Sequence, residues 1–437
     1  MQGKKLIQSL HLSNFLTFGR SFRKIDLQPL NVLIGPNGSG KSNFIEALRI
    51  LSATPEDLEK PIREGGGTSE YLWKGVQAPS LFGLGATISW ETAGYPIRHS
   101  IGVASDRFYV RFETIEAIPL NGEESSPLIF YTYNHGDIAI LRSKKILPAS
   151  DNFGSLGSQL ISDKMLLMGD LSNTTGGSWP LEFPETHNFP LEKIEYTGSH
   201  ISVDITRSIL SQYKDPIALP AFSHLQKIYS GISFYTGWNL GRFGTLRYPQ
   251  KADLPSTTLL EDGSNLGLVL ISKPAIVRQE ITERLKIVLP TVEEIFPKIE
   301  GGTVPLYIRE KGFSTPTPAS RLSEGTLRYL CLLTLLLDPE PPPIICLEEP
   351  EIGLHPHVVS QIAELLIDAS QRTQLIVTTH SDALISGLSE CPEAIITCER
   401  DDEGTKLRRL DPEQIKPWLD RYALGDLWRM GEIGGVR

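Results

Sequence analysis

The segment GPNGSGKS at residues 35–42 has the GxxxxGK[ST] spacing of a phosphate-binding loop. Its three glycines allow backbone N–H groups to turn inward around a phosphate, and its lysine can reach the β- and γ-oxygens of a nucleoside triphosphate. A chance glycine turn is the alternative, but a predicted strand, LNVLIG, precedes the loop and a predicted helix, SNFIEALRIL, follows it. We expect Lys41 to contribute to catalysis, Ser42 to bind Mg²⁺, and the nucleotide to contact Gly35, Asn37, Gly38, Ser39, Gly40, Lys41, Ser42 and Asn43.

Two adjacent carboxylates follow a predicted buried strand in PIICLEEPEIGLHP, residues 343–356. Ligands of parallel sheets bind at the carboxyl ends of the strands, which is where Glu348 and Glu349 would lie. One carboxylate can hold Mg²⁺, directly or through water, and the next can polarise an attacking water. A solvated acidic turn is the alternative for this segment taken alone. The phosphate loop in the same chain favours the functional interpretation.

Two further segments carry polar residues at the ends of predicted apolar elements. QLIVTTHSD at 374–382 predicts a strand ending in His380, near the expected position of a γ-phosphate. A histidine after a strand is more often structural, but its order after the other motifs favours a functional role. RLSEGTLRYL at 321–330 places Ser323 and Gly325 at the start of a long helix, where a hydroxyl, N–H groups and the helix dipole can face an anion. Alone, this segment is an ordinary N-cap.

The rest of the chain predicts an α/β protein. Short alternating runs at 83–143, separated by Gly, Pro and acidic turns, predict an antiparallel sheet, and residues 150–200 predict a loop. Helical patterns follow at 204–300, notably IVRQEITERLKIVL and TVEEIFPKI. The last part alternates the helix TLRYLCLLTLLL and a helix near 356–370 with the strands PIICLEE, QLIVTTH and AIITCER, which predicts parallel pairing.

Composition excludes several classes of protein. The 437 residues carry a net charge of −10, which excludes a uniformly basic nucleic-acid coat but not a local basic face. Four cysteines with no CxxC pair predict buried, reduced thiols rather than a zinc site or a disulfide framework. No signal-peptide core and no run of 18 apolar residues is present, so we expect a cytoplasmic protein that does not associate with membranes.

Taken in order, the four motifs resemble those of ABC-class ATPases of the SMC, RecF and OLD branch. LHLSNFLTFG before the phosphate loop is typical of that branch, and SRLSEGTLRYL, EEPEIGLHP and TTHS look like its signature, Walker B with D-loop, and switch-histidine segments. The chain is most similar to stand-alone AAA-domain ATPases of the branch, with SILSQYKDP, LLEDGSNLGLVL and LGDLWRMGEIGG. The resemblance implies a P-loop NTPase fold of ABC-ATPase type, with a mixed central sheet, an antiparallel β-subdomain and an inserted helical lobe.

The resemblance also implies domain boundaries. Residues 1–200 would form the N-terminal part of the ATPase head, with Walker A and the β-subdomain. Residues 201–325 would form the helical lobe, ending in the signature segment, and residues 326–400 the C-terminal part of the head. Residues 401–437 would form a tail.

The resemblance implies site roles as well. Glu349 would be the catalytic base and His380 would sense the γ-phosphate. Glu348 would bind Mg²⁺ together with Ser42, and Gln212 would be the Q-loop residue at nucleotide and metal, with an exposed loop glutamine as the alternative. The signature residues, which would meet ATP bound to a second subunit in a homodimer or higher homo-oligomer, are Ser323, Glu324 and Gly325.

Two residues depart from the family pattern. The usual LSGGQ is LSEGT, so Glu324 adds a carboxylate near a triphosphate. The usual Asp before the catalytic Glu is Glu348, one methylene longer, which favours a water-mediated contact with Mg²⁺.

The function that we expect is an ATP-hydrolysing switch that dimerises around ATP and Mg²⁺ and controls a separate effector, a TOPRIM-type nuclease in prokaryotic anti-phage defence. The sequence contains no coiled-coil arm, and too few residues follow His380 to form a TOPRIM domain. The main alternative is a RecF-like DNA repair ATPase that binds DNA directly; its candidate basic residues are Arg142, Lys144, Lys145, Arg242, Arg247 and Lys251. A transporter subunit and a non-enzymatic scaffold are further alternatives.

Overall fold

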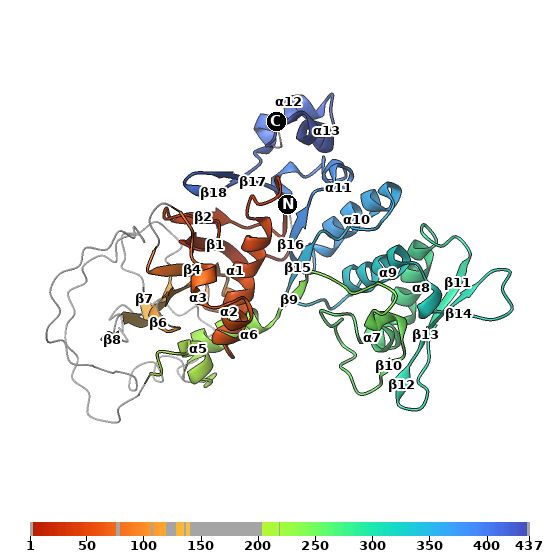
Figure 1. The fold of residues 1–437 in the computed structure, drawn as a ribbon, viewed down its shortest axis with the longest axis horizontal. Helices are drawn as coiled ribbons and strands as arrows, with labels where there is room; N and C mark the ends of the chain where they lie inside the picture. The colour runs from red at the N-terminus through yellow and green to blue at the C-terminus, as the bar shows by residue number, and fades with distance from the viewer. Residues whose placement is uncertain are drawn as a thin grey trace.

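A computed structural model describes residues 3–75, 79–105, 108–118, 128–134, 137–139, 203–217 and 219–434. In Figure 1 the chain forms a body that contains two large sheets, a lobe that extends from it, and a C-terminal helical element. The predicted loop at 150–200 and three of the candidate basic residues, Arg142, Lys144 and Lys145, lie outside the described residues. Among the described helices, none is both long and apolar enough to cross a bilayer.

The first sheet has seven antiparallel strands in the order β2-β1-β4-β5-β6-β7-β8. The antiparallel prediction for 83–143 is therefore confirmed for the described strands, and the sheet also takes up the first two strands of the chain. Its strands are β1 (Ile7–Ser13), β2 (Arg23–Asp26), β4 (Leu81–Ile88), β5 (Ile97–Ala104), β6 (Val110–Ala117), β7 (Leu128–Asn134) and β8 (Asp137–Ala139).

The second sheet is mixed, as predicted, in the order β18-β17-β3-β16-β15-β9. Five strands are parallel and β18 runs antiparallel to β17. Both faces are buried because alternate side chains enter different cores: Ile344 and Cys346 face one, Ile345 and Leu347 the other. Its strands are β3 (Leu30–Ile34), β9 (Ile232–Tyr235), β15 (Ile344–Glu348), β16 (Gln374–Thr379), β17 (Ile395–Asp401) and β18 (Gly404–Arg409).

Helix α1 (Lys41–Ala53) joins the two sheets. Phe44 and Leu48, one helical turn apart, belong to the same buried cluster as Leu84 of the first sheet and Cys346 of the second. Because α1 packs on both sheets, its N-terminus is held rigidly beside the carboxyl ends of the parallel strands. The other helices of this part are α2 (Glu59–Glu64), α3 (Thr68–Tyr71), α5 (Ile209–Gln212) and α6 (Pro220–Ser230).

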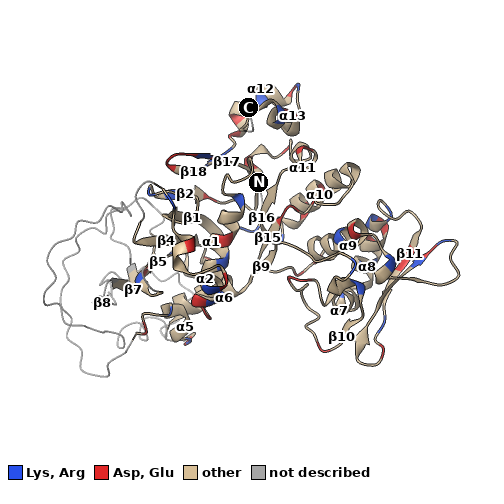
Figure 2. Cartoon of the chain, in the orientation of Figure 1, with Lys and Arg blue, Asp and Glu red and all other residues tan. Residues whose placement is uncertain are grey.

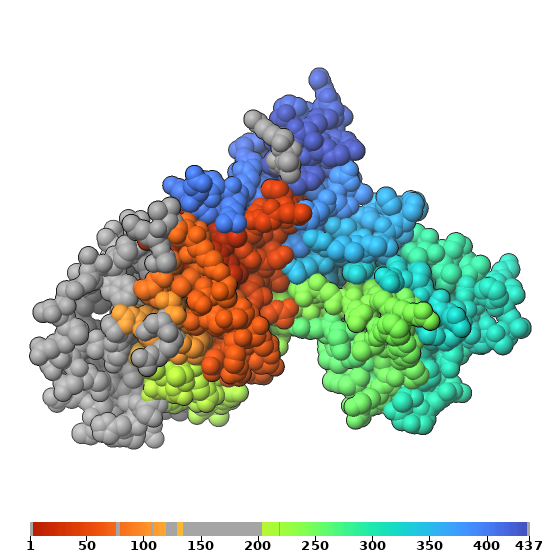
Figure 3. Space-filling model, viewed as in Figure 1, coloured from red at the N-terminus to blue at the C-terminus, as the bar shows by residue number. Residues whose placement is uncertain are grey.

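The inserted lobe leaves the central sheet after β9. Figure 3 shows it, green to cyan, projecting from the body with an open notch between them. The structure therefore starts the lobe later than the expected residue 201, because α5 and α6 pack in the core of the first sheet and β9 belongs to the second. The elements of the lobe are β10 (Gln250–Lys251), α7 (Leu266–Ser272), α8 (Ala275–Leu285), β11 (Val292–Pro297), β12 (Thr303–Val304), β13 (Leu306–Glu310) and β14 (Thr317–Pro318).

The helical prediction for TVEEIFPKI is wrong, because this segment contains β11, which pairs antiparallel with β13. Val292 and Ile295 are buried three residues apart, a spacing that is typical of a helix face. The register shifts between Val292 and Glu294, and such a β-bulge turns residues three apart to one side of a strand. The bulge thus reproduces a helical pattern in an extended segment.

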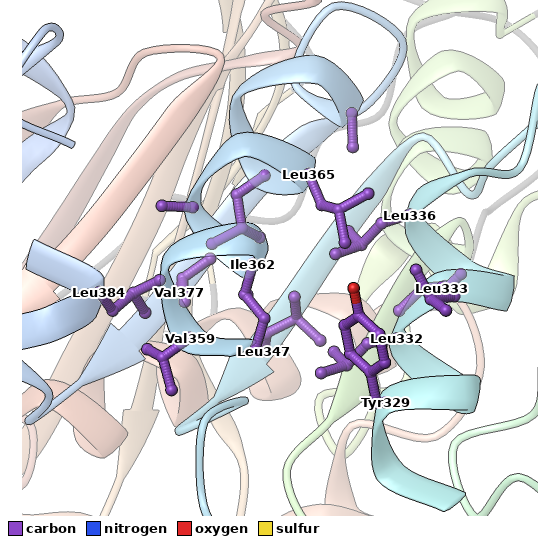
Figure 4. Close-up of a cluster of buried hydrophobic side chains, with 14 of the residues drawn as sticks. Tyr329, Leu332, Leu333, Leu336, Leu347, Val359, Ile362, Leu365, Val377 and Leu384 are labelled. Atoms are coloured by element: carbon purple, nitrogen blue, oxygen red, sulfur yellow. The ribbon is translucent and has the colours of Figure 1, made fainter. Parts of the chain in front are cut away.

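The predicted helices and strands of the last part of the chain are confirmed. Helix α9 (Glu324–Leu336) packs against α10 (Pro356–Ala369) and the central sheet, and Figure 4 shows Tyr329, Leu333 and Leu336 of α9 facing Ile362 and Leu365 of α10. This core fixes the N-terminus of α9 relative to β15. The remaining helices are α11 (Asp382–Ser386), α12 (Pro412–Leu419), α13 (Leu424–Met430) and the 3-10 turns η1 (Glu91–Ala93), η2 (Thr245–Arg247), η3 (Ala319–Arg321) and η4 (Pro392–Ala394).

All four cysteines are buried and free, as predicted. Burial raises the pKa of the Cys391 thiol to about 11 and that of the Cys398 thiol to about 12. The thiols are therefore protonated and unreactive at neutral pH.

Candidate functional site

The phosphate loop connects β3 to α1, as the spacing predicts. Gly38 and Gly40 have φ angles of 75° and 103°, in the left-handed region that favours glycine. A Cβ at position 40 would lie 2.5 Å from the Thr405 hydroxyl and 2.6 Å from the Thr17 hydroxyl. Thr405 also donates a hydrogen bond to the carbonyl of Ser39 at 2.9 Å. Two segments distant in sequence thus support the loop from behind.

Lys41 lies at the base of this loop, with 6% of its surface exposed. Its ammonium donates to the carbonyls of Gly35 and Pro36 at 2.9 and 3.0 Å, which curls the side chain back under the loop. Burial lowers the pKa of Lys41, and Glu349 is among the groups that oppose this shift. The loop therefore holds a cation in position for an anionic ligand.

The two acidic residues lie at the edge of the sheet beside the loop. In the parallel register Glu348 pairs with Thr378, and Thr379 pairs with Ile34, so the strand ends are level with the start of the loop. Burial raises the pKa of Glu348, and the Ser42 hydroxyl lies near enough to its carboxyl to oppose this shift. The structure thus brings together two of the three residues that the sequence suggests for Mg²⁺, Ser42 and Glu348 but not Gln212.

Glu349 and His380 face one another. The His380 Nε2 lies 3.6 Å from the Glu349 Oε1, and each side chain is about one-third exposed, at 35% and 37%. Burial lowers the pKa of His380, Lys41 lowers it further, and Glu349 raises it. Glu349 itself has a φ of 44°, a strained conformation for a residue with a side chain, and such strain occurs at functional sites.

The signature segment begins α9 at the other side of the D-loop. Ser323 is the N-cap and its Oγ accepts a hydrogen bond from the Thr326 N–H at 3.0 Å, while Glu324 is exposed. A Cβ on Gly325 would lie 2.9 Å from the Gly353 carbonyl oxygen. The signature helix therefore contacts the D-loop of its own chain, and larger side chains at position 325 would displace that loop.

Gln212 is placed differently from the expectation. Its amide nitrogen donates to the carbonyls of Asp204 and Arg207 at 3.0 Å, and its oxygen accepts from the Asp204 N–H at 2.9 Å. The side chain therefore closes a turn at α5, which packs with the first sheet, rather than extending from a strand end toward Ser42. Sequence order suggested it because it precedes the lobe, but the strand that leads into the lobe is β9.

The residues that directly follow β9 lie at the same edge of the sheet as the acidic pair, and the sequence did not indicate them. β9 pairs in parallel with β15, so Thr236 follows it at the same edge as Glu348, and both Thr236 and Asn239 are exposed there. The apolar run ISFY before them is too short to identify the strand from sequence alone.

A cavity of about 560 Å³ opens beside the phosphate loop. It is lined by Pro36–Ser39 of the loop, by 73–75 and by 400–402 of the β17–β18 turn. The backbone N–H of Trp73 donates to the Asn14 carbonyl at 2.9 Å, and a Cβ at Gly75 would lie 2.1 Å from the Trp73 indole ring. An aromatic ring, cations and carboxylates thus surround a space next to the phosphate site. The loop residues Asn37, Gly38 and Ser39 of this lining were predicted, whereas 73–75 and 400–402 were not.

The residues present fit a nucleotide and Mg²⁺. The Ser39 Oγ is buried without a hydrogen-bond partner among the described residues, and a Cβ at Gly35 would lie 2.6 Å from it. No group of three His, Cys, Asp or Glu residues that could hold a metal occurs in the described part of the chain. Mg²⁺ keeps several waters and takes one or two carboxylates plus phosphate oxygens, so a single Glu348–Ser42 pair suits it.

Two of the described candidate basic residues, Arg242 and Arg247, make contacts within the chain. Arg247 donates to the carbonyls of Leu240, Gly241 and Leu322 at 2.8, 2.9 and 2.5 Å, so its guanidinium joins the lobe to the signature segment. Arg242 lies over the Phe243 ring. Figure 2 shows Lys and Arg interspersed with Asp and Glu along the described elements in this view.

Solved structures share this fold at low identity. The Smc head bound to the C-winged helix domain of ScpA matches with a TM-score of 0.55 and 14% identity, over 94% of this chain and 99% of that chain. The Smc head domain with an extended coiled coil bound to the C-terminal domain of ScpA, from Pyrococcus furiosus, matches with a TM-score of 0.52 and 13% identity, over 95% and 98%. The fold is that of an SMC head domain, as the resemblance implies.

A relative found by sequence is the Old nuclease of Escherichia phage P2, which is 27% identical over 148 residues. The match covers 31% of this chain and 24% of that protein, so the chain corresponds to about a quarter of its length.

The model of one protein family, described as "AAA domain, putative AbiEii toxin, Type IV TA system", matches residues 30–93 and 215–386. These segments make up more than half of the chain and contain the phosphate loop, the signature segment, the acidic pair and His380. The chain belongs to this AAA-domain family and is a P-loop ATPase of the AAA/SMC-like type.

Proposed function

We propose that this protein binds ATP with Mg²⁺, hydrolyses it to ADP and phosphate, and uses the cycle to control a separate effector. The observation that carries the proposal is the meeting of Lys41, the Glu348–Ser42 pair and the Glu349–His380 pair at one edge of the central sheet. Phosphoryl transfer needs little covalent chemistry from the protein, and these groups supply positioning and charge.

Each residue has a defined task in the proposal. Lys41 and the loop N–H groups bind the phosphates, and Glu349 accepts a proton from the attacking water. His380, whose pKa is lowered, is neutral at pH 7 and hydrogen-bonds the γ-phosphate or the water from its position 3.6 Å from Glu349. Mg²⁺, held through Ser42 and Glu348, would neutralise charge on the transferring phosphate. The nucleoside would occupy the cavity at Trp73.

Dimerisation around two nucleotides is part of the same proposal. The N-terminus of α9, capped by Ser323, presents free N–H groups and the positive end of a helix dipole, which suit a phosphate of ATP bound to a second copy. The direct contact between Gly325 and the D-loop would carry such an event to Glu349 within the chain. The signature segment is therefore the proposed site of subunit contact.

The effector that we propose is a TOPRIM-type nuclease in prokaryotic anti-phage defence, acting from another chain in the cytoplasm. The likeness to a quarter of the Old nuclease of phage P2 supports an association of this ATPase type with nuclease activity. Direct DNA binding is the alternative, and the engagement of Arg247 with main-chain carbonyls does not favour it.

ATP turnover by the wild-type chain, measured as phosphate release with Mg²⁺, tests the enzymatic part. Glu349→Gln should keep ATP binding, lose hydrolysis at least about a hundredfold, and accumulate as an ATP-bound dimer in light scattering. Absence of turnover in the wild type, or of any ATP-dependent dimer, would contradict the proposal. Co-purification of a stoichiometric nuclease tests the effector part, and a stoichiometric partner of another class would contradict it.

A further inference from the structure

The carboxylate of Glu351 connects the D-loop to the end of the neighbouring strand. Its Oε1 accepts a hydrogen bond from the Thr379 hydroxyl at 2.5 Å and another from the His380 N–H at 3.2 Å. The Thr379 Oγ1 in turn accepts from the Ser381 N–H at 3.0 Å. Residues on both sides of His380 are thus attached, directly or through one hydroxyl, to a single carboxylate oxygen.

The second carboxylate oxygen of Glu351 is buried and has no hydrogen-bond partner among the described residues. Burial raises the pKa of Glu351, and the Thr379 hydrogen bond opposes this shift. Because a buried, partly satisfied carboxylate costs stability, an apolar residue would serve packing better here. A carboxylate placed here at such a cost fits a group with a positional task.

The contacts of Glu351 help to fix the position of His380 relative to Glu349. The Glu349 N–H donates to the Thr378 carbonyl at 2.9 Å, so the main chain of Glu349 is attached to β16 two residues before His380. Glu349 also has the positive φ of 44°, and a strained residue persists only where its surroundings hold it. Glu351, two residues later, supplies the second attachment by holding His380.

We propose that Glu351 is a positioning residue that holds His380 against Glu349 for ATP hydrolysis. This inference rests on the proposed ATPase function. Glu351 does not itself reach the reacting atoms, because one oxygen is occupied by Thr379 and His380 and the other is buried.

Three substitutions of Glu351 test whether its role depends on a hydrogen-bond acceptor or on a negative charge. Glu351→Gln keeps an oxygen acceptor and removes the charge, so kcat should remain within about threefold of wild type. Glu351→Asp keeps the charge but withdraws the oxygens by about 1.5 Å, and Glu351→Ala removes them. Both should lower kcat about ten- to a hundredfold with the Kd for ATP unchanged, since small misplacements at a reaction centre have effects of this size.

A matched pair of threonine variants, one at the end of β16 and one immediately before its start, provides a control for lost stability. Thr379→Val removes the donor to Glu351, whereas Thr373→Val removes a buried hydroxyl that donates to the Pro342 carbonyl at 2.6 Å, at the other end of the strand. Both should lower the melting temperature to a similar extent. Only Thr379→Val should lower kcat, by about tenfold, and this comparison holds even if Glu351→Ala fails to fold.

The outcomes separate this inference from the proposed function. If the wild type turns over ATP and Glu349→Gln does not, the proposed function stands and the Glu351 variants are informative. A kcat for Glu351→Gln as low as that for Glu351→Ala would show that the charge is required and would overturn the positioning role. Equal kcat in the two threonine variants would overturn it as well.

Discussion

Replacement of Glu349 should make the protein inactive, and the glycine variant should be more stable than the alanine variant. A residue with a side chain at positive φ costs about 1–2 kcal/mol. Glycine avoids this cost but loses about 0.5–1 kcal/mol more conformational entropy on folding than alanine. With φ at 44°, Glu349→Gly should therefore exceed Glu349→Ala in unfolding free energy by about 1 kcal/mol.

The comparison between the glycine and alanine variants separates the effect of backbone strain on stability from the effect of losing the Glu349 charge. Glu349 is one of the charges that raise the pKa of Glu348, so removing it relieves a like-charge repulsion equally in both variants and in Glu349→Gln. All three should lose ATP turnover at least about a hundredfold while ATP binding through Lys41 persists. Glu349→Gln keeps the strained backbone and should not match the stability of Glu349→Gly.

The assay is urea unfolding of the nucleotide-free variants beside phosphate release with ATP and Mg²⁺. Glu283, exposed in α8, is the control position, since there Gly should be less stable than Ala by about 1 kcal/mol. The diagnostic result is that glycine is more stable than alanine at position 349 and less stable than alanine at position 283. If Glu349→Gly is no more stable than Glu349→Ala, the backbone at this position is not strained. If ATP turnover survives in these variants, another group is the catalytic base, with Glu348 as the first candidate.

Four further changes test other parts of the structure. Lys41→Ala should abolish ATP binding in calorimetry, because the phosphates lose their cation, and an unchanged Kd would contradict the phosphate-site assignment. Trp73→Ala should weaken ATP binding by about 1–3 kcal/mol, the value of one aromatic–base stack, with inorganic triphosphate binding as the unaffected control. Glu324→Gln should strengthen ATP-dependent dimerisation in light scattering by removing a carboxylate near the proposed phosphate, and a weaker dimer would refute the composite site. Burial in β1 lowers the pKa of His11 to about 4, so the unfolded chain binds a proton that the folded chain excludes, and stability should fall by about 3 kcal/mol from pH 6.5 to 4. His11→Gln should remove this contribution to the pH dependence of stability in urea titrations, and an unchanged slope would show that other groups cause it.

The phosphate loop and the acidic pair could be identified from sequence because their chemistry is contiguous. The loop needs glycines at positive φ and a lysine within eight residues, and all of these requirements are local. Glu348 ends a buried strand and Glu349 follows it, so their place at a sheet edge follows from strand order alone. The antiparallel sheet, the parallel pairing and helices α1, α9 and α10 were also predictable, because each has a regular apolar pattern.

Other features depended on contacts between distant segments. The β-bulge in β11 gave Val292 and Ile295 a helical spacing, and only pairing with β13 shows the segment to be a strand. Gln212 stands at a suitable place in sequence order, but its amide is used by the turn at α5. Sequence order does not reveal which strand leads into the lobe, because strand neighbours are chosen by packing.

The local sequence thus determined the phosphate-binding chemistry, and the tertiary structure decided what surrounds it. Trp73 and the turn at 400–402 line one cavity although more than 300 residues separate them. Glu351 reaches Thr379 and His380 only because β15 and β16 are adjacent and in register. Side-chain contacts across strands depend on that register, which the whole buried core sets rather than any single segment.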